Sequence, residues 1–397
     1  MPTENAETLF SGLSKNTVLL AAASLFADLA TEMLTPILPI FLTQTLRTSG
    51  SIVGLVDGIA QAWRNIVDGF FGPVSDRLRK RKIIALAGYA LAALGKPLMG
   101  HSSVWQGVLA GRLLDRSGAG TFAAPRDALV SSSTDAQYRG RGFGLESLGE
   151  NGGAFLGPIL TVLLLYELQV EVRTIFYLAF LPGLLAFAII LFVREPQAAE
   201  PPPKTNAAQY SARFPLAYWK FLFVVAVFSL GNSSNSFLIL RTQEVSNSLL
   251  MTTLMYGGFN LVAALTSYPV GLLSDTWGRT KLLLASLGVS FLVYTGFSFA
   301  LSIATTACFF LAYGMYEAGF RSMGRALAAD LVPSELRASA MAWYSATAGT
   351  FQLVASIVGG VLWDSVGHTS TFVYGMISSA IGIFLGVLML PRSPRQT

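Results

Sequence analysis

Long apolar stretches alternate with short polar connections along the whole chain. Twelve stretches are long enough to cross a bilayer, whose hydrocarbon core requires about 20 apolar residues per helix. They lie near residues 17–42, 50–73, 83–100, 104–127, 141–166, 173–193, 217–240, 250–273, 281–303, 305–328, 339–362 and 369–390. No long polar insertion interrupts the series. The pattern predicts an all-α membrane protein with twelve transmembrane helices.

One connection differs from the others in composition and lies at the midpoint of the chain. Residues 194–216 contain three consecutive prolines among Gln, Ala and Asn, which predicts an extended cytoplasmic linker. The linker divides the chain into two expected domains, an N-terminal six-helix bundle (1–193) and a C-terminal six-helix bundle (217–397).

An internal repeat supports this division. Gly72 and Asp76 recur as Gly271 and Asp275, each at an offset of 199 residues. Two halves of the same topology predict a substrate site at their interface, near the middle of the membrane.

Composition narrows the class of protein. The chain is 53% hydrophobic and only 12% charged, whereas soluble domains carry about 25% charged residues. This composition argues against a water-soluble enzyme, a disordered chain and a nucleic-acid binder. The single cysteine, Cys308, excludes an internal disulfide, and two histidines leave little scope for a metal site or a catalytic triad. We therefore expect neither enzymatic activity nor a cofactor.

Basic residues are concentrated in alternate connections, which predicts the orientation. Five of them follow the second stretch within residues 77–82, whereas the opposite connections hold only Arg47, Arg173 and Arg241. The positive-inside rule places both termini in the cytoplasm. The polar N-terminus lacks the basic segment of a cleaved signal peptide. We expect a multi-pass protein of the cell's inner membrane that acts as a monomer within the lipid bilayer.

The segment after the second stretch carries a recognisable signature. It reads Gly72-Pro-Val-Ser-Asp76-Arg77-Leu-Arg79-Lys80-Arg81-Lys82. This resembles the Gly-x-x-x-Asp-Arg-x-Gly-Arg-Arg-Lys motif of the major facilitator superfamily, with Arg79 in place of the second glycine. The resemblance implies the major facilitator fold, alternating access and a cytoplasmic gate. The gate residues would be Gly72, Asp76, Arg77, Asp68, Gly271, Asp275, Arg126, Arg139 and Arg337. The alternative interpretation of the basic loop is an anchor for topology alone.

A second signature lies in the fifth stretch. Gly149, Gly153, Gly157 and Pro158 are similar to the Gly-x-x-x-Gly-Pro motif of the superfamily's proton-driven antiporters, although Ile159-Leu160 replaces the closing Gly-Gly. The alternative is ordinary close packing of a small-residue face beside a proline kink. The sequence around Asp28, Glu32 and Asp115 also resembles a bacterial branch whose substrates are mostly unassigned.

Ionisable residues at membrane depth cost several kcal/mol unless they face a cavity or a partner. Asp28 and Glu32, four residues apart, share a face of the first helix. Together with Asp115 they are the predicted proton-coupling residues, because desolvation favours the protonated form of a carboxylate. Their three negative charges are balanced by the three positive charges of Arg64, Arg112 and Arg116. A closed network of ion pairs with no free proton site is therefore the alternative.

The predicted substrate site combines charged groups of the first half with mainly neutral polar and aromatic groups of the second. Its residues are Arg64, Arg112, Arg116, Asp57, Gln61, Asn232, Asn235, Tyr256, Asn260, Tyr313, Glu317 and Arg321. The Glu317–Arg321 spacing also fits a structural pair within one helix.

No nucleotide-binding motif is present, so an ion gradient is the expected energy source. The sequence predicts proton-coupled export of a small organic molecule, drug-like or siderophore-like, by alternating access. The alternatives are proton-coupled import of an organic anion, a lipid-translocating carrier, and a non-transporting membrane sensor with a transporter fold. The intact Gly-x-x-x-Asp motifs in both halves argue against the sensor.

Overall fold

The computed structural model describes residues 14–78, 80–135, 138–195, 214–299, 302–333 and 336–391. Within these ranges the chain is mainly helical, and the helices follow the predicted stretches, most of them extending a few residues further at each end. The expected linker falls mostly outside the described residues. The N-terminal half contains α1 (Lys15–Glu32), α2 (Leu38–Ile40), η1 (Phe41–Thr45), α3 (Gly50–Leu78), α4 (Arg81–His101), α5 (Trp105–Ser133), α6 (Arg139–Val162), η3 (Leu163–Glu167), α7 (Val172–Leu178) and α8 (Phe180–Phe192).

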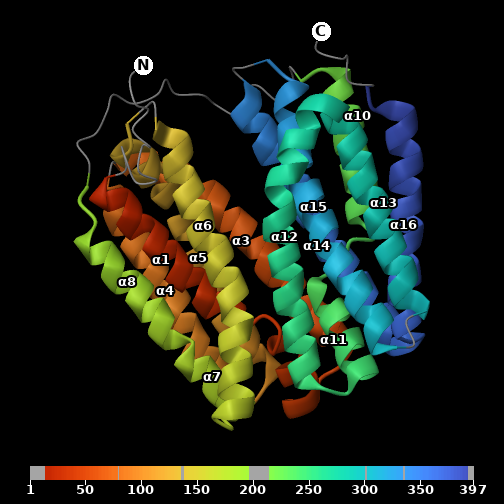
Figure 1. The fold of residues 1–397 in the computed structure, drawn as a ribbon, viewed down its shortest axis with the longest axis horizontal. Helices are drawn as coiled ribbons and strands as arrows, with labels where there is room; N and C mark the ends of the chain where they lie inside the picture. Colours follow the sequence, from red (N-terminus) through yellow and green to blue (C-terminus); the bar gives the residue numbers. More distant parts are fainter. Residues whose placement is uncertain are drawn as a thin grey trace, which may run out of the picture.

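The C-terminal half repeats this arrangement (Figure 1). It contains α10 (Leu216–Ser229), α11 (Asn235–Ser246), α12 (Leu249–Trp277), α13 (Arg279–Phe299), α14 (Ile303–Asp330), α15 (Arg337–Ser365) and α16 (His368–Met389). Among the described helices, seven are long and apolar enough to cross a membrane by length and composition. The other long helices contain more charged residues or are interrupted, and they fall short of the same hydropathy or length. The chain is a multi-pass, all-α membrane protein.

The first helix of each half is broken, whereas the sequence predicted one continuous helix. In the N-terminal half α1 ends at Glu32, and Pro36 and Pro39 lie at the break before α2 and η1. Each proline lacks the N–H that a continuing helix needs. In the C-terminal half the break between α10 and α11 includes Gly231, and the Ser234 hydroxyl caps α11 by accepting from the Ser236 N–H. The two breaks occupy equivalent positions of the repeat.

Glycines determine how closely the helices of the N-terminal half approach one another. A Cβ at Gly95 of α4 would lie 2.6 Å from the Asp115 backbone nitrogen, and one at Gly111 of α5 would lie 2.8 Å from the Met99 nitrogen. On the other side of the bundle, Gly149 and Gly153 of α6 lie against backbone carbonyls of α1. The absence of side chains at these positions brings charged neighbours on α1, α4, α5 and α6 into one cluster.

The two halves touch along α3 and α15 and along α6 and α12. The α3–α15 contact extends from Gly50, which lies against Trp363, to Asn65, which lies against Gly349. Beyond this contact Ile66 and Phe70 of α3 are exposed. Figure 1 shows the bundles close together at the end where α7 and α11 lie and farther apart at the opposite end, where α10 begins. The described contacts between the halves therefore lie toward the first end, which we call the closed end, and the second is called the open end.

Candidate functional site

A polar cavity of about 70 Å³ lies within the N-terminal half. A space of this size holds several water molecules. Helices α1, α3, α4, α5 and α6 contribute its charged lining. These residues are Asp28, Glu32, Arg64, Lys96, Asp115, Arg116, Arg126 and Glu150. Five of these residues were predicted from the sequence as proton-coupling or substrate-binding residues, and the structure brings them together. They are Asp28, Glu32, Arg64, Asp115 and Arg116.

Asp115 is the centre of a buried ion-pair network. Its carboxylate lies 2.8 Å from Lys96 Nζ, 3.4 Å from Arg116 Nε and 3.7 Å from Arg112 Nη1. Three cations around one carboxylate hold it in its charged form. Asp115 therefore joins α4 to α5 through these ion pairs, and its predicted part in proton coupling stays a prediction.

Sequence reasoning missed Lys96. Its side chain is 2% exposed, and it donates to the Ala92 carbonyl as well as to Asp115. It was counted within an apolar stretch, although a lone lysine inside a membrane helix is itself a signal of a buried partner. The close approach of α4 to α5 at Gly95 places the ammonium group beside the carboxylate.

Asp57 connects this network to the C-terminal half. Arg112 Nη2 lies 3.6 Å from its Oδ1. The hydroxyls of Ser234 and Ser236 both donate to its Oδ2, the first at 3.0 Å. Asp57 therefore lies at the N-terminus of α11, where the helix dipole favours a negative charge.

Glu32 makes a second contact between the halves. The Tyr256 hydroxyl on α12 donates to Glu32 Oε2 at 2.7 Å. Asp57 and Tyr256 are equivalent in the 199-residue repeat, and each binds at or beside the broken first helix of the opposite half. We call the Asp57–Ser234/Ser236 and Tyr256–Glu32 contacts the inner clasps.

Two further contacts, the outer clasps, lie at the closed end. The Asp364 carboxylate on α15 accepts from the Gly50 N–H at 2.8 Å and from the Ser51 N–H at 2.7 Å, and so caps α3 of the other half. The Tyr166 hydroxyl accepts from the Leu250 N–H at 2.6 Å, near the start of α12. Ser51 and Leu250 are again equivalent in the repeat.

Two residues of the cavity have free charged groups. Within the described ranges neither Asp28 nor Arg64 makes a hydrogen bond or an ion pair shorter than 4.0 Å. Both line the cavity, and they have opposite charges. They are the groups most available to a proton or a ligand.

The remaining predicted substrate residues are distributed differently. Asn260 donates to the Ala154 carbonyl at 3.0 Å and so bridges the halves, whereas Gln61 bonds weakly to Asn65 within α3. Tyr313 is fully buried, and its hydroxyl donates to Asn235 at 2.9 Å.

Asn232 is also buried in the C-terminal half and accepts from Tyr294 at 3.4 Å. Glu317 and Arg321 form the intrahelical pair at 3.9 Å, with Arg321 65% exposed. The predicted substrate residues that belong to the C-terminal half do not line the charged cavity.

The predicted gate residues are only partly described. Gly72 and the side chains of Asp76, Arg77, Arg139 and Asp275 lie outside the part of the structure whose surroundings are described. Asp68 and Arg337 are exposed, and a Cβ at Gly271 would meet open space. Arg126 is buried and forms ion pairs with Glu146 and Glu150 of its own half. In this open arrangement these four described residues form no hydrogen bond or ion pair with the described part of the opposite half.

The glycine motif of α6 lies in a close helix contact. Gly149, Gly153 and Gly157 face the α1 backbone, where Gly157 approaches the link from Glu32 to Met33. Pro158 faces the other half, because a Cβ at Gly257 of α12 would lie 3.3 Å from it. The motif therefore packs α6 against both the cavity helix α1 and the partner bundle.

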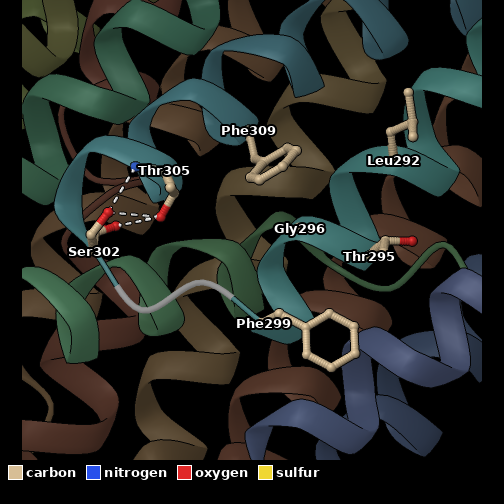
Figure 2. Close-up of a pocket in the computed structure, with 7 residues that line it drawn as sticks. All are labelled: Leu292, Thr295, Gly296, Phe299, Ser302, Thr305 and Phe309. Atoms are coloured by element: carbon tan, nitrogen blue, oxygen red, sulfur yellow. Dashed lines mark hydrogen bonds between the residues drawn. The ribbon is translucent and has the colours of Figure 1, made fainter.

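A larger hollow of about 450 Å³ lies between the end of α13 and the start of α14. Figure 2 shows Phe299, Phe309 and Leu292 around it, with the hydroxyls of Ser302 and Thr305 hydrogen-bonded at its rim. Its lining contains no charged residue among those that the structure describes. The polar cavity of the N-terminal half is therefore the candidate site.

Comparison with known proteins identifies the family. The family model of the Major Facilitator Superfamily matches residues 20–240 and 221–397. The uncharacterized MFS-type transporter MJ1317 of Methanocaldococcus jannaschii is 34% identical over 387 residues, which cover 95% of each chain. The multidrug resistance protein MdtG of Citrobacter koseri is 27% identical over 284 residues, covering 68% of this chain and 69% of that protein.

Solved structures show the same fold. A mutant of the nucleoside transporter NupG superimposes with a TM-score of 0.83 at 13% identity, covering 95% of this chain and all of that one. A bacterial homolog of the human lysosomal transporter Spinster, in an inward-facing conformation, has a TM-score of 0.71 at 14% identity and covers 97% and 96% of the two chains. The predicted fold is confirmed, and the chain belongs to the major facilitator superfamily of membrane transporters.

Proposed function

We propose that this transporter exports a small organic molecule in exchange for protons, by alternating access. The observation that carries the proposal is the polar cavity, in which Asp28 has no ion-pair partner among the described residues and Glu32 binds the opposite half through Tyr256. One carboxylate is available to a proton, and the other connects the cavity to the closure between the halves. The 27% identity to a multidrug resistance protein supports export of a drug-like compound, and a siderophore-like compound is the other substrate that we propose.

The direction rests on an inferred orientation. The basic starts of α4 and α13 lie at the end where the halves are apart, and basic residues favour the cytoplasmic side. We therefore infer an inner-membrane protein in an inward-open state, with the inner and outer clasps closing the periplasmic end. From this state a cytoplasmic substrate enters, and release outside requires the clasps to open.

Import of an organic anion together with a proton is the second candidate. It is favoured by Arg64, whose guanidinium lines the cavity without an ion pair in the described part of the chain. The charged lining sums to zero formal charge, so a proton on Asp28 leaves one net positive charge for an anion.

Reconstitution in proteoliposomes tests both candidates. A fluorescent lipophilic cation and a fluorescent organic anion serve as probes, and a pH dye inside the vesicles reports proton movement. Export by exchange predicts that an inward-directed proton gradient expels the cation probe. Import by symport predicts that the same gradient accumulates the anion probe instead.

The variants Asp28→Asn and Glu32→Gln identify the proton site. We expect each variant to reduce gradient-driven transport by at least about tenfold, as loss of one coupled proton site implies. Exchange of substrate for substrate across the membrane, without a proton gradient, should stay measurable. A pair of variants that both retain full gradient-driven transport would show that these carboxylates do not couple protons.

A further inference from the structure

One arginine holds two glutamates at the open end of the cavity. Arg126 of α5 lies 3.0 Å from Glu146 Oε1 and 2.8 Å from Glu150 Oε1, both on α6. The Ser24 hydroxyl of α1 donates to Glu146 Oε1 at 3.2 Å and accepts from Arg126 Nη1 at 3.2 Å. A third carboxylate, Asp127, bonds the same guanidinium from a largely exposed position.

This cluster contains more negative than positive charge. The Glu146 side chain is only 6% exposed, so it lacks the water that stabilises a free carboxylate. Its one cationic partner is shared with Glu150, which is 40% exposed. Two carboxylates that share a site repel each other, and binding a proton to one removes the repulsion.

The charges on neighbouring elements do not remove this imbalance. The groups that act on the cluster from other helices are Asp28 on α1, Asp68 on α3 and Arg321 on α14. Two acids and one arginine do not supply the missing positive charge, and the excess carboxylate of the Glu146–Glu150 pair remains.

A second observation points to a proton-bearing ligand at this place. The Tyr89 hydroxyl of α4 has no hydrogen-bond partner among the described residues, although the residue is only 1% exposed, and it lines the same cavity as Arg126 and Glu150. Its ring is stacked on Phe122 at 4.1 Å, and the Arg126 guanidinium lies 5.9 Å from that same ring. A buried, unpaired hydroxyl beside a charged cluster is a suitable partner for water that carries protons.

We propose that Glu146 and Glu150 form a second proton-binding site, which holds one proton between the two carboxyl groups beside Arg126. In the protonated state one carboxyl carries an O–H, and the other remains a carboxylate paired with the guanidinium. Loss of that proton to water leaves both carboxylates on Arg126. Glu150 is the more exposed end of the pair and lines the cavity together with Asp28, whereas Glu146 is the buried end and reaches the cavity through Arg126.

Only the part that this second site would play in transport rests on the proposed function. Proton binding itself is measurable without a substrate. The experiment uses purified full-length protein in nanodiscs and the proton as the probe. Infrared difference spectra between acidic and alkaline buffer report carboxylic acid C=O groups. A pH-indicator dye counts the protons released in the same pH jump.

We expect Glu146→Gln and Glu150→Gln each to release about one proton fewer per chain than the wild type, since the pair titrates as a unit. Each variant should also lose the corresponding C=O band. Asp135→Asn removes an exposed carboxylate at the end of α5 and is the matched control, which should keep that band. Glu146→Asp keeps an acid at the site and should retain the proton with a shifted band.

Unchanged proton release and an unchanged band in both glutamine variants would overturn the proposal. If the band disappears as expected but Asp28→Asn and Glu32→Gln keep full gradient-driven transport, the second site stands and the coupling assignment under the proposed function fails. If instead both glutamine variants keep the band while Asp28→Asn and Glu32→Gln lose gradient-driven transport, the coupling assignment stands and the second site is refuted.

Discussion

Asp364 offers the sharpest test of how the closed end is held. Its carboxylate accepts two backbone N–H groups of α3 from the opposite half and also binds the Ser51 hydroxyl. A helix N-cap is worth about 0.5–2 kcal/mol, typically about 1 kcal/mol. Because Asp364 is exposed, water reduces the charge contribution, and we take about 1 kcal/mol for Asp364→Ala. The population ratio of closed to open should then fall about fivefold.

Cysteine accessibility measures this shift. The exposed Cys308 is first replaced by serine, and Ser356→Cys then places a thiol on α15 against Gly54 and Gly58 of α3. Ser356 is buried in the closed state, so a membrane-impermeant maleimide reacts only when the halves separate there. In nanodiscs, Asp364→Ala should raise the labelling rate about fivefold, in proportion to the open population.

Glu171→Ala is the matched control, because it removes an exposed carboxylate that makes no cap hydrogen bond, at the start of α7. It should leave the labelling rate at the background value. Equal rates for Asp364→Ala and Glu171→Ala would refute the argument that the trans cap stabilises this closure.

Three other substitutions test the packing and charge of the N-terminal half. Lys96→Met removes the shortest ion pair of Asp115 and should destabilise the fold by about 3 kcal/mol, seen as a lower Tm in detergent. A double variant with Asp115→Asn should be less stable still, because Arg116 then loses its ion pair and Arg112 keeps only Asp57. Gly153→Val forces α6 away from α1 and should cost about 1–3 kcal/mol or more, whereas a Tm within a degree of wild type would contradict the close contact. Arg64→Ala should leave Tm nearly unchanged, since it has no ion pair to lose among the described residues, but should weaken binding of the anionic probe about tenfold in a fluorescence titration.

The positions of the helices were predictable because bilayer thickness fixes the length of each apolar stretch. The grouping of Asp28, Glu32, Arg64 and Arg116 was predictable for a related reason. Charged residues in a membrane helix turn inward, so residues on facing helices meet in one cavity. The repeat of Gly72 as Gly271 likewise indicated two equivalent halves.

The detailed partners were not predictable, because they depend on distances between helices. Lys96 and Asp115 are joined only because Gly95 allows α4 to approach the backbone of α5. The breaks after Glu32 and Ser229 had signals in Pro36 and in the Gly-Asn-Ser-Ser segment, but apolar length hid them. Arg126 was expected at the gate from the family resemblance, whereas the structure pairs it with two glutamates one turn apart on α6.

In the inner clasps, hydrogen-bond acceptors and donors are distributed unequally between the two halves of the repeat. Equivalent positions of the repeat hold Asp57 in one half and Tyr256 in the other, yet in both clasps the carboxylate belongs to the N-terminal half and the hydroxyls to the C-terminal half. Hydrogen bonds to an ionised acceptor are about twice as strong as neutral ones, so protonation of Glu32 or Asp57 weakens its own clasp. Asp57 is also paired with Arg112, which Asp115 holds from the other side. Opening of this end must therefore break hydrogen bonds to carboxylates that all belong to one half, while the C-terminal half contributes only hydroxyl donors to the inner clasps.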